Sequence, residues 1–280
     1  MTADLIVCLK WAPVRPEIDP LTGTVSTDDR FSGLSPADHA ALEWGLRVAS
    51  QQDLTVGVVT VGGPEADPGL VQALTVGAAQ AVRIQPSRVS GQPSSPLVAA
   101  ALAHVCESAS LIFCGDHSLD RGSGSVPAFL AAKLVFGQAL GCVGLELDGD
   151  LVAERRLDQG RRERLAITGK TVLSFEGGLE LRRAPLSATL AVSNADISVL
   201  EMALPEPDRS VSVATTGPFR PRARVLPAPE GTTFNRIREL TGVGDERPAS
   251  QQLELTPDEA ADVVIDQLTT WGYRETSTET

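Results

Sequence analysis

The sequence predicts an α/β protein with a doubly wound, mostly parallel sheet, helices on both faces, an appended antiparallel hairpin region and a C-terminal arm. Short and almost continuously apolar segments alternate with longer segments of helical periodicity over the first 145 residues. Strands that are apolar throughout are typical of a parallel sheet covered on both sides. After Gly144 the pattern changes to short strands separated by glycine turns.

Five apolar segments account for the parallel sheet, and four helices connect them. A serine followed by proline opens the first helix at Ser35 and the third at Ser95. The second helix begins at Pro64 and ends at Gly77, and the fourth extends from Ser125 to Phe136 with Gly137 as its stop. The expected strands are Leu5–Leu9, Leu54–Val61, Ala81–Ile84, Leu111–Cys114 and Cys142–Leu147.

Other segments depart from this alternation. Asp-Pro and Thr-Gly within Trp11–Leu34 predict a hairpin excursion. Leu151–Arg156, Glu163–Ile167 and Thr171–Phe175 are expected to be antiparallel strands appended to the sheet. We place the domain boundary between residues 203 and 204, because residues 204–250 are rich in Pro, Arg, Gly and Ser, as in an extended arm. A capping sequence at Thr256 then opens a C-terminal helix that reaches Trp271, and residues 275–280 are expected to be frayed.

Composition excludes several classes of protein. The net charge of −12 opposes non-specific binding to nucleic acid. No apolar run reaches the roughly 20 residues of a membrane span, and the N-terminus lacks the basic start of a signal peptide, so we expect a cytoplasmic protein without membrane insertion. The cysteines lie singly in apolar runs and the histidines are scattered, which favours buried reduced thiols and no metal site.

The loop after Leu111–Cys114 is the best candidate for a binding site. It contains several glycines and serines and precedes a helix, where backbone N–H groups and the helix dipole favour an anion such as phosphate. It matches neither the P-loop nor the GxGxxG pattern. No catalytic constellation is present, and His117 is the one candidate acid or base in the loop. The sequence therefore favours a binding module whose chemistry belongs to a cofactor.

Several motifs in the same order resemble the β subunits of electron transfer flavoproteins. They are Val7–Lys10, Asp19–Gly23, Ser35–Glu43, Cys114–Val126 and, most diagnostic, Ala153–Leu165, which has the pattern AxRxxDxGxxExL. The resemblance covers residues 4 to about 203. Ser35, Ala37, Ser125 and Lys170 differ from the usual asparagine, phenylalanine, glutamine and proline, so this is a divergent member.

The resemblance implies a function, cofactors and partners. By this resemblance, residues 1–203 form a nucleotide-binding domain that binds AMP and helps hold the FAD of an α subunit. Residues 204–280 lie beyond the resemblance, and we expect this arm and C-terminal helix to wrap the partner subunit. The heterodimer carries electrons from a flavin-dependent dehydrogenase to a quinone-linked oxidoreductase. The implied cofactor contacts are Cys8, Ser35, Pro36, Ala37, Asp38, Val61, Gly115, Asp120, Ser123, Gly124, Ser125 and Val126.

The segment after the appended strands corresponds to the family's recognition loop for dehydrogenases. Leu186 matches its anchor residue, with Arg182 and Arg183 in place of the usual lysines. The alternative is that Leu186 packs against its own hairpin.

Three other functions stay open. A bifurcating relative holds a second FAD in place of AMP, and a stand-alone adenine-nucleotide module resembles a universal stress protein. A free-standing enzyme of adenylate chemistry is disfavoured by the lack of a P-loop and of catalytic acids.

Overall fold

The computed structural model describes residues 1–19, 21–87, 93–193, 196–204, 230–241 and 253–271. The chain divides into two compact units, Met1–Phe219 and Arg220–Thr280. Within the described ranges, no helix combines the length and the apolar character needed to cross a membrane.

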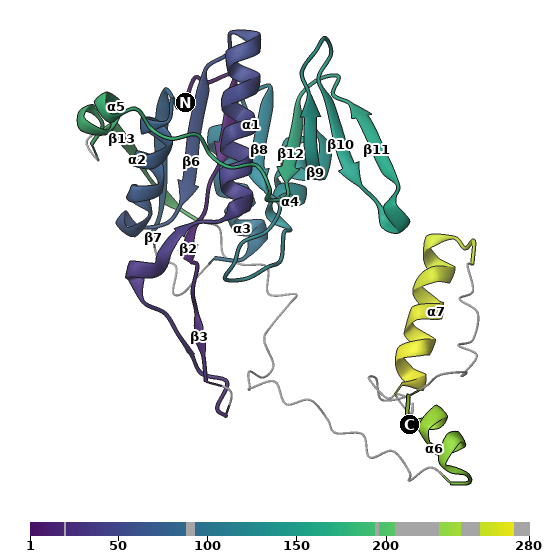
Figure 1. Ribbon diagram of the computed structural model, residues 1–280. Coiled ribbons are helices and arrows are strands. Elements are labelled where there is room, and N and C mark those ends of the chain that lie inside the picture. The colour runs from purple at the N-terminus through teal and green to yellow at the C-terminus, as the bar shows by residue number, and fades with distance from the viewer. Residues whose placement is uncertain (20, 88–92, 194–195, 205–229, 242–252, 272–280) are drawn as a thin grey trace, which may run out of the picture. The chain divides into compact units, whose positions relative to one another are not determined.

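A large mixed sheet organises the first unit, and most of its strand pairs are parallel (Figure 1). From β9 to β13 all neighbours run parallel, and β10 and β11 extend the sheet by antiparallel pairing. In sheet order, the described strands are β11 (Arg162–Ala166), β10 (Val152–Arg156), β9 (Gly137–Glu146), β12 (Thr171–Phe175), β8 (Leu111–Gly115), β1 (Leu5–Cys8), β6 (Val56–Val61), β7 (Gln80–Ser87) and β13 (Ile197–Ala203).

Helices cover both faces of the sheet. Side chains alternate along β1, so that Leu5 and Val7 belong to one core cluster and Ile6 and Cys8 to the other. The first cluster includes residues of α1 (Pro36–Gln52) and α2 (Asp67–Thr75), and the second includes residues of α3 (Ser95–Cys106) and α4 (Val126–Leu134). The predicted doubly wound α/β class is therefore confirmed.

The chain reverses direction across the sheet beside β1. It proceeds from β1 to β6 and β7 on one side, and then returns through α3 to β8 on the other side. The predicted excursion is also present, as the small pairs β2 (Trp11–Pro13) with β5 (Ser32–Leu34) and β3 (Glu17–Ile18) with β4 (Val25–Ser26). Ligands of open α/β sheets bind at such a switch point, outside the carboxyl ends of the strands.

The expectation that Thr171–Phe175 is an antiparallel strand is wrong. This segment is β12, which lies between β8 and β9 and pairs in parallel with both. All five of its residues are buried, whereas β10 and β11 are partly exposed. The physical reason is burial, because a strand with no exposed residue is stabilised most in the middle of a covered sheet.

Three further elements differ from expectation. Strand β13 was not predicted, since its edge position leaves most of its residues accessible. Helix α4 ends at Leu134, where Val135 adopts the left-handed conformation (φ 57°) in place of the expected stop at Gly137, which opens β9. A helix, α6 (Thr233–Thr241), lies within the segment expected to be an extended arm.

In the second unit, α7 (Pro257–Thr270) begins with the predicted cap. The Thr256 hydroxyl accepts from the backbone N–H of Glu259, and the Glu259 carboxylate accepts from the backbone N–H of Thr256. The rest of the expected arm, at residues 205–229 and 242–252, and the expected frayed end at 275–280 lie outside the described residues.

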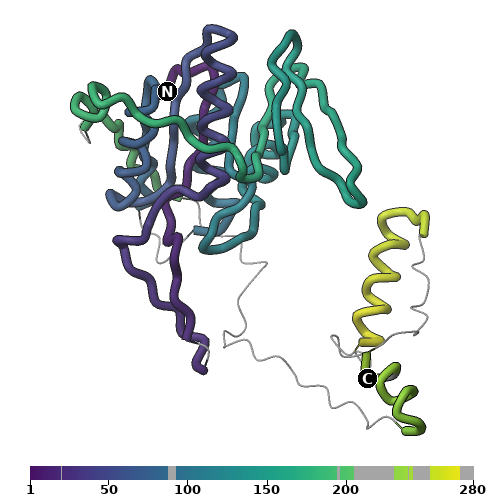
Figure 2. Tube along the Cα trace, in the orientation of Figure 1, coloured from purple at the N-terminus to yellow at the C-terminus, as the bar shows by residue number. Residues whose placement is uncertain are grey.

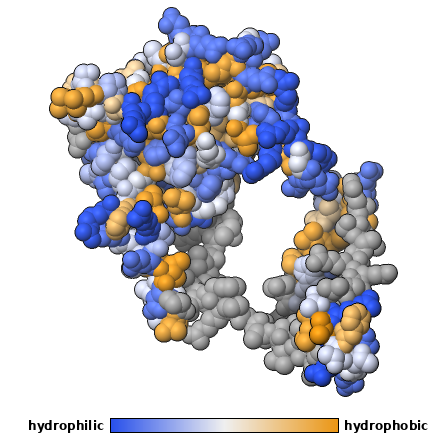
Figure 3. All heavy atoms as spheres, in the orientation of Figure 1, coloured by the Kyte–Doolittle hydropathy of each residue, from blue (hydrophilic) through white to orange (hydrophobic). Residues whose placement is uncertain are grey.

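A segment that follows β12 crosses the outer surface of α1 and leads to a short helix, α5 (Leu186–Ala191). Figure 2 shows it as a green trace in front of the purple α1. Arg182 holds the crossing in place, because its Nε lies 2.9 Å from Oε2 of Glu43 in α1 and its Nη2 lies 3.1 Å from Oε1. Leu186 and Leu190 are 74% and 78% exposed, and hydrophobic side chains are visible at α5 in Figure 3.

The first turn of α1 contains a buried carboxylate. Ser35 is the N-cap, and its hydroxyl accepts from the Asp38 backbone N–H at 3.0 Å. In return, Oδ2 of Asp38 accepts from the Ser35 N–H at 3.0 Å and from its hydroxyl at 2.6 Å. Burial raises the pKa of Asp38 to about 6, although the bonds from Ser35 and Lys10 oppose the rise.

This pKa generates a prediction for stability. Folded Asp38 keeps its proton up to about pH 6, whereas the carboxyl of the unfolded chain releases it near pH 4. The protonated Asp38 side chain therefore makes its full contribution to the free energy of unfolding below about pH 4, and this contribution is lost as the pH rises through about 6. The free energy of unfolding of the wild type, relative to Asp38→Asn, should therefore fall by about 3 kcal/mol between pH 4 and 7. Urea unfolding at several pH values measures this difference.

The exposed Asp53 lies beyond the other end of α1, and Asp53→Asn is the matched control. Its pH profile should follow the wild type. A constant difference between the wild type and Asp38→Asn over this range would contradict the buried-carboxylate account.

Candidate functional site

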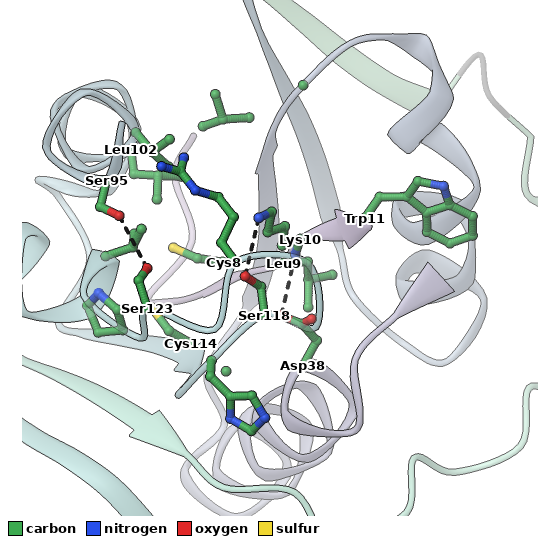
Figure 4. A pocket seen from close by; sticks show the side chains of 18 of the residues that line it. Cys8, Leu9, Lys10, Trp11, Asp38, Ser95, Leu102, Cys114, Ser118 and Ser123 are labelled. Carbon is green, nitrogen blue, oxygen red and sulfur yellow. Dashed lines mark hydrogen bonds between the residues drawn. The ribbon is translucent and has the colours of Figure 1, made fainter. Parts of the chain in front are cut away.

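A cavity of about 370 Å³ opens at the carboxyl ends of β1, β6 and β8, at the switch point of the sheet (Figure 4). This volume lies within the range of small-molecule sites. Among the described residues, its lining comes from the ends of these strands, from the excursion after β1 and from the starts of α1 and α3. It also comes from the loop of residues 116–125 before α4, which we call the glycine loop.

Most of the predicted cofactor contacts lie together in this cavity. Those that line it are Cys8, Asp38, Val61, Gly115, Ser123, Gly124, Ser125 and Val126. Ser35, Pro36 and Ala37 are not part of the lining and lie beside it, at the cap and first turn of α1. Asp120 also lies outside the lining, where it pairs with Lys10.

The glycine loop approaches its surroundings more closely than a side chain would allow. Gly124 has φ +56°, and a Cβ on it would lie 2.4 Å from the carbonyl oxygen of Asp116. Gly122 has a similar φ of +62°, but a Cβ on it would meet nothing within 4 Å. The loop then enters α4, whose N-cap Ser125 makes no side-chain hydrogen bond to the helix, so its first N–H groups have no side-chain cap.

Lys10 connects the end of β1 to this loop. Its Nζ lies 2.6 Å and 2.8 Å from the two carboxylate oxygens of Asp120 and 3.3 Å from the Ser118 hydroxyl. Its backbone N–H also donates to Oδ1 of Asp38 at 3.4 Å. Lys10 therefore orders two walls of the cavity, α1 on one side and the loop on the other.

The start of α1 reaches the end of β8 because of Gly115. A Cβ at this position would lie 3.0 Å from the Asp38 nitrogen and 3.1 Å from the carbonyl carbon of Ala37. Any larger residue would push the helix away from the strand. Of Ser35, Ala37 and Asp38, Asp38 lines the cavity, and the contact of these three residues with a cofactor stays a prediction.

The inner wall of the cavity is formed by thiols and apolar groups. Cys8 and Cys114 are paired across β1 and β8, and Cys106 of α3 adjoins Cys8. The neighbouring thiols of Cys106 and Cys114, together with burial, raise the pKa of the Cys8 thiol well above its ordinary value. All four cysteines are buried and free, as predicted, and a protonated buried thiol behaves as a small apolar group.

His117 lies on the cavity wall beside Asp116. Its Nδ1 is 2.5 Å from Oδ1 of Asp116, and about half of its side chain is exposed. The described residues include no group of three His, Cys, Asp or Glu side chains that could hold a metal ion. The arrangement can bind and orient a ligand, and Asp116 is the carboxylate that contacts His117.

Several lining residues were not predicted. Lys10, Glu65, Ser95 and Arg121 reach the cavity from four different segments. Ser95 lies 3.5 Å from Ser123, oxygen to oxygen, and this contact joins the start of α3 to the glycine loop (Figure 4). Two features of the sequence could have identified lining residues that were missed. They are the positive charge of Lys10 at the end of a strand and the positive charge of Arg121 within the glycine loop.

The predicted docking residues lie far along the chain from this cavity. Leu186 is exposed, so it does not pack against its own hairpin. Arg183 is also exposed, whereas Arg182 is engaged by Glu43, a residue with only 5% of its side chain accessible. The role of these residues in docking stays a prediction.

Comparison with known proteins identifies the family. Residues 22–197 match the family model described as electron transfer flavoprotein domain, which is well over half of the 280 residues. The electron transfer flavoprotein subunit beta of Clostridium acetobutylicum is 30% identical over 158 residues, which cover 55% of this chain and 60% of that relative. The subunit beta of Bacillus subtilis is 29% identical over 207 residues, 71% of this chain and 80% of that relative.

The similarity extends to another group of relatives. Protein FixA of Rhizobium meliloti is 26% identical over 256 residues, 84% of this chain and 88% of that protein. The matches with the Clostridium protein and with its Thermoanaerobacterium thermosaccharolyticum counterpart span only 60% and 62% of those relatives. The chain belongs to the electron transfer flavoprotein family, as a divergent member similar to its β subunits.

Proposed function

We propose that this chain is the β subunit of a heterodimeric electron transfer flavoprotein and that it binds AMP in the cavity at the ends of β1, β6 and β8. The α subunit holds the FAD, and this chain forms one wall of the flavin site. Electrons pass from a flavin-dependent dehydrogenase through the heterodimer to a quinone-linked oxidoreductase. The observation that carries the proposal is a nucleotide-sized cavity at the switch point. At the start of α4 the backbone of Ser123–Val126, which we call the glycine cradle, forms one end of this cavity.

The glycine cradle suits the phosphate of AMP. Backbone N–H groups from Ser123 to Val126, at the start of a helix, can donate to phosphate oxygens, and the helix dipole favours the negative charge. Gly124 leaves no room for a Cβ, so the backbone itself forms the surface of the cradle. Ser123 and Ser125 add two hydroxyl groups at the same place.

The apolar part of the cavity suits an adenine ring. Cys8 and Val61 end adjacent parallel strands, and Val98 and Leu102 approach from α3. The carboxylate of Asp38 lies at the same end of the sheet, although its bonds to Ser35 already use part of its capacity. The site thus has one end for an anion and another for a flat apolar group.

The chain itself supplies binding groups rather than redox chemistry. The Cys8 thiol that lines the cavity is buried and its pKa is raised well above its ordinary value, and His117 contacts the carboxylate of Asp116. FAD supplies the transfer of electrons when the partner subunit is present. The relatives named as β subunits are parts of such assemblies by name, which supports the same role here.

A bifurcating subunit with a second FAD is the alternative. Arg121 favours it, because this guanidinium adds a positive charge to the cavity beyond the glycine cradle. A stand-alone nucleotide module is disfavoured by the appended strands β10 and β11, which favour a permanent partner over a simple sensor.

The cradle generates the first prediction of this section. Gly124→Ala should lower the affinity for AMP at least tenfold, because the new methyl group requires the loop to move away from Asp116 and to lose hydrogen bonds to phosphate. Calorimetric titration of the nucleotide-free chain with AMP measures the affinity.

Gly122→Ala is the matched control. It places alanine at the same kind of positive φ but in open space, so backbone strain is present without the collision. Its affinity for AMP should stay within about threefold of the wild type. Equal losses in both variants would mean that loop strain, and not the cradle, controls binding.

The proposed placement of AMP in this chain and of FAD in the α subunit generates a second prediction. The chain purified alone should be colourless, and it should form a 1:1 yellow heterodimer when produced with an FAD-binding α subunit. Absorbance at flavin wavelengths and nucleotide extraction measure both points. One FAD and one AMP per heterodimer are expected, whereas two FAD and no AMP would favour the bifurcating alternative. Stoichiometric flavin in the isolated chain would contradict the proposal.

The third prediction concerns docking of a dedicated dehydrogenase at α5. Leu186→Ala should slow reduction of the reconstituted heterodimer by about tenfold, because an exposed leucine that enters a partner pocket can act as a hot spot. Leu21→Ala is the control, since Leu21 is 80% exposed but lies at the β3–β4 turn. Equal rates for wild type and Leu186→Ala would remove Leu186 from the interface. Fast reduction by many acyl-CoA dehydrogenases would contradict a dedicated partner.

A further inference from the structure

The segment that crosses α1 between β12 and α5 is not held by backbone hydrogen bonds. Residues 177–184, which we call the strap, form no backbone-to-backbone hydrogen bond with any residue that the structure describes. The side chains of Leu179, Leu181 and Ala184 are partly buried against the first core cluster. The strap therefore depends on side-chain contacts for its place on α1.

One carboxylate on α1 holds the strap through polar contacts. Oε2 of Glu43 accepts from the backbone N–H of Arg182 at 3.1 Å and from its Nε at 2.9 Å, and Oε1 accepts from its Nη2 at 3.1 Å. Arg47, one turn further along α1, donates from Nε to Oε1 at 2.8 Å. Each carboxylate oxygen thus receives two charge-assisted hydrogen bonds, and the guanidinium of Arg182 binds both oxygens in the bidentate geometry that this pair prefers.

Glu43 lies out of reach of a binding partner. Only 5% of its side chain is accessible, whereas 41% of the Arg182 side chain is. Burial alone would raise the pKa of Glu43, but the bonds from Arg182 and Arg47 lower this pKa below its ordinary value, so the side chain is a carboxylate at neutral pH. Its negative charge therefore acts on its own chain, at the strap.

Arg182 and Arg183 have different surroundings although they adjoin in sequence. The N–H groups of Arg182 are directed at Glu43 from three positions. Arg183 is exposed and forms no hydrogen bond or ion pair with the described part of the chain. Of the two arginines predicted to dock a partner, one is thus engaged by its own chain and the other is available.

The strap leads directly into α5. Pro185 is the N-cap of this helix and has an extended backbone (φ −62°, ψ 141°), so only a short connection separates Arg182 from Leu186. Helix α5 has six residues, none of which is buried, and a helix of this length is not stable by itself. Figure 2 shows the strap approaching it from across α1. The position of α5 therefore depends on the segment that precedes it.

We propose that Glu43 is a positioning residue for docking: through Arg182 it holds the strap on α1, so that α5 presents its exposed leucines to a partner in a fixed position. The inference rests on the proposed docking of a dehydrogenase at α5 and adds the residue that prepares this surface. Binding costs less free energy when the docking element is already ordered, because less backbone and fewer side chains have to be immobilised. Arg182 acts from within the chain, and Arg183 is the arginine that can contact the partner.

The first test measures the mobility of the strap in the isolated full-length chain. In ¹⁵N relaxation measurements, the backbone order parameters of residues 182–190 should be about 0.85 in the wild type and should fall below about 0.6 in Glu43→Gln, which keeps the shape of the side chain and removes its charge. Glu180→Gln removes the same charge from an exposed strap residue and should leave these values unchanged. The order parameters of β8 report whether the sheet of each variant is folded.

The second test measures reduction of the reconstituted heterodimer by the dehydrogenase. Glu43→Gln should raise the KM for the heterodimer about tenfold and leave kcat within about twofold, because the variant changes the docking surface and not the flavin site. Arg182→Gln should have the same effect, and the double variant should be no worse than either single variant, since the two residues act as one unit. Arg183→Gln changes the charge of a residue outside this unit, so its effect should add to that of Glu43→Gln.

Three results would overturn the inference, and a fourth would overturn the docking proposal on which it rests. Equal order parameters in the wild type and Glu43→Gln would show that the strap does not depend on this carboxylate. Additive losses in the double variant would show that Glu43 and Arg182 act separately, and a fall in kcat without a rise in KM would place the effect of Glu43 away from docking. If Leu186→Ala is reduced as fast as the wild type, docking at α5 fails, and the role of Glu43 in docking fails with it even where the order parameters respond.

Discussion

The close contact between the first turn of α1 and the end of β8 is the constraint on which the site depends. Gly115 allows the backbone of Asp38 to approach so closely that a Cβ would lie 3.0 Å from the Asp38 nitrogen and would require the helix to shift. This approach places the Asp38 carboxylate beside the N–H of Lys10, and Lys10 in turn reaches Asp120 in the glycine loop. One missing side chain thus sets the position of a helix, a lysine and a loop, and the cavity is the space left between them.

Local patterns predicted most of the fold. Helical starts at Ser35 and Thr256 were predicted correctly because caps depend only on a few neighbouring residues. The place of β12 was not, because the order of strands depends on partners that are distant in sequence. The signal that could have identified it was the burial pattern, since Thr171–Phe175 has no polar alternation of the kind seen in β11. Strand β13 had no such signal, because an edge strand with exposed residues resembles a loop in composition.

The site was predicted where its residues are local and missed where they come from distant segments. Ser123–Val126 lie at the end of the loop that follows β8, so the end of this strand already points to them. Ser95 reaches the cavity because α3 lies on the same face as α4, and no local rule conveys this. Arg121 has the composition of a solvated loop residue, and its contact with Pro93 depends on the tertiary fold. Residue type thus predicts what a group can bind, while topology decides which groups meet.

The insertion of β12 between β8 and β9 also constrains the order in which the chain can assemble. The ribbon formed by β9, β10 and β11 is complete in sequence at Ala166, yet it joins the sheet only through Thr171–Phe175. During synthesis, β8 and β9 therefore both expose unpaired backbone edges until residue 175 has left the ribosome. The glycine loop follows β8 and shares this delay, so a translational pause between Ala166 and Thr171 would prolong the stage most exposed to wrong strand pairing.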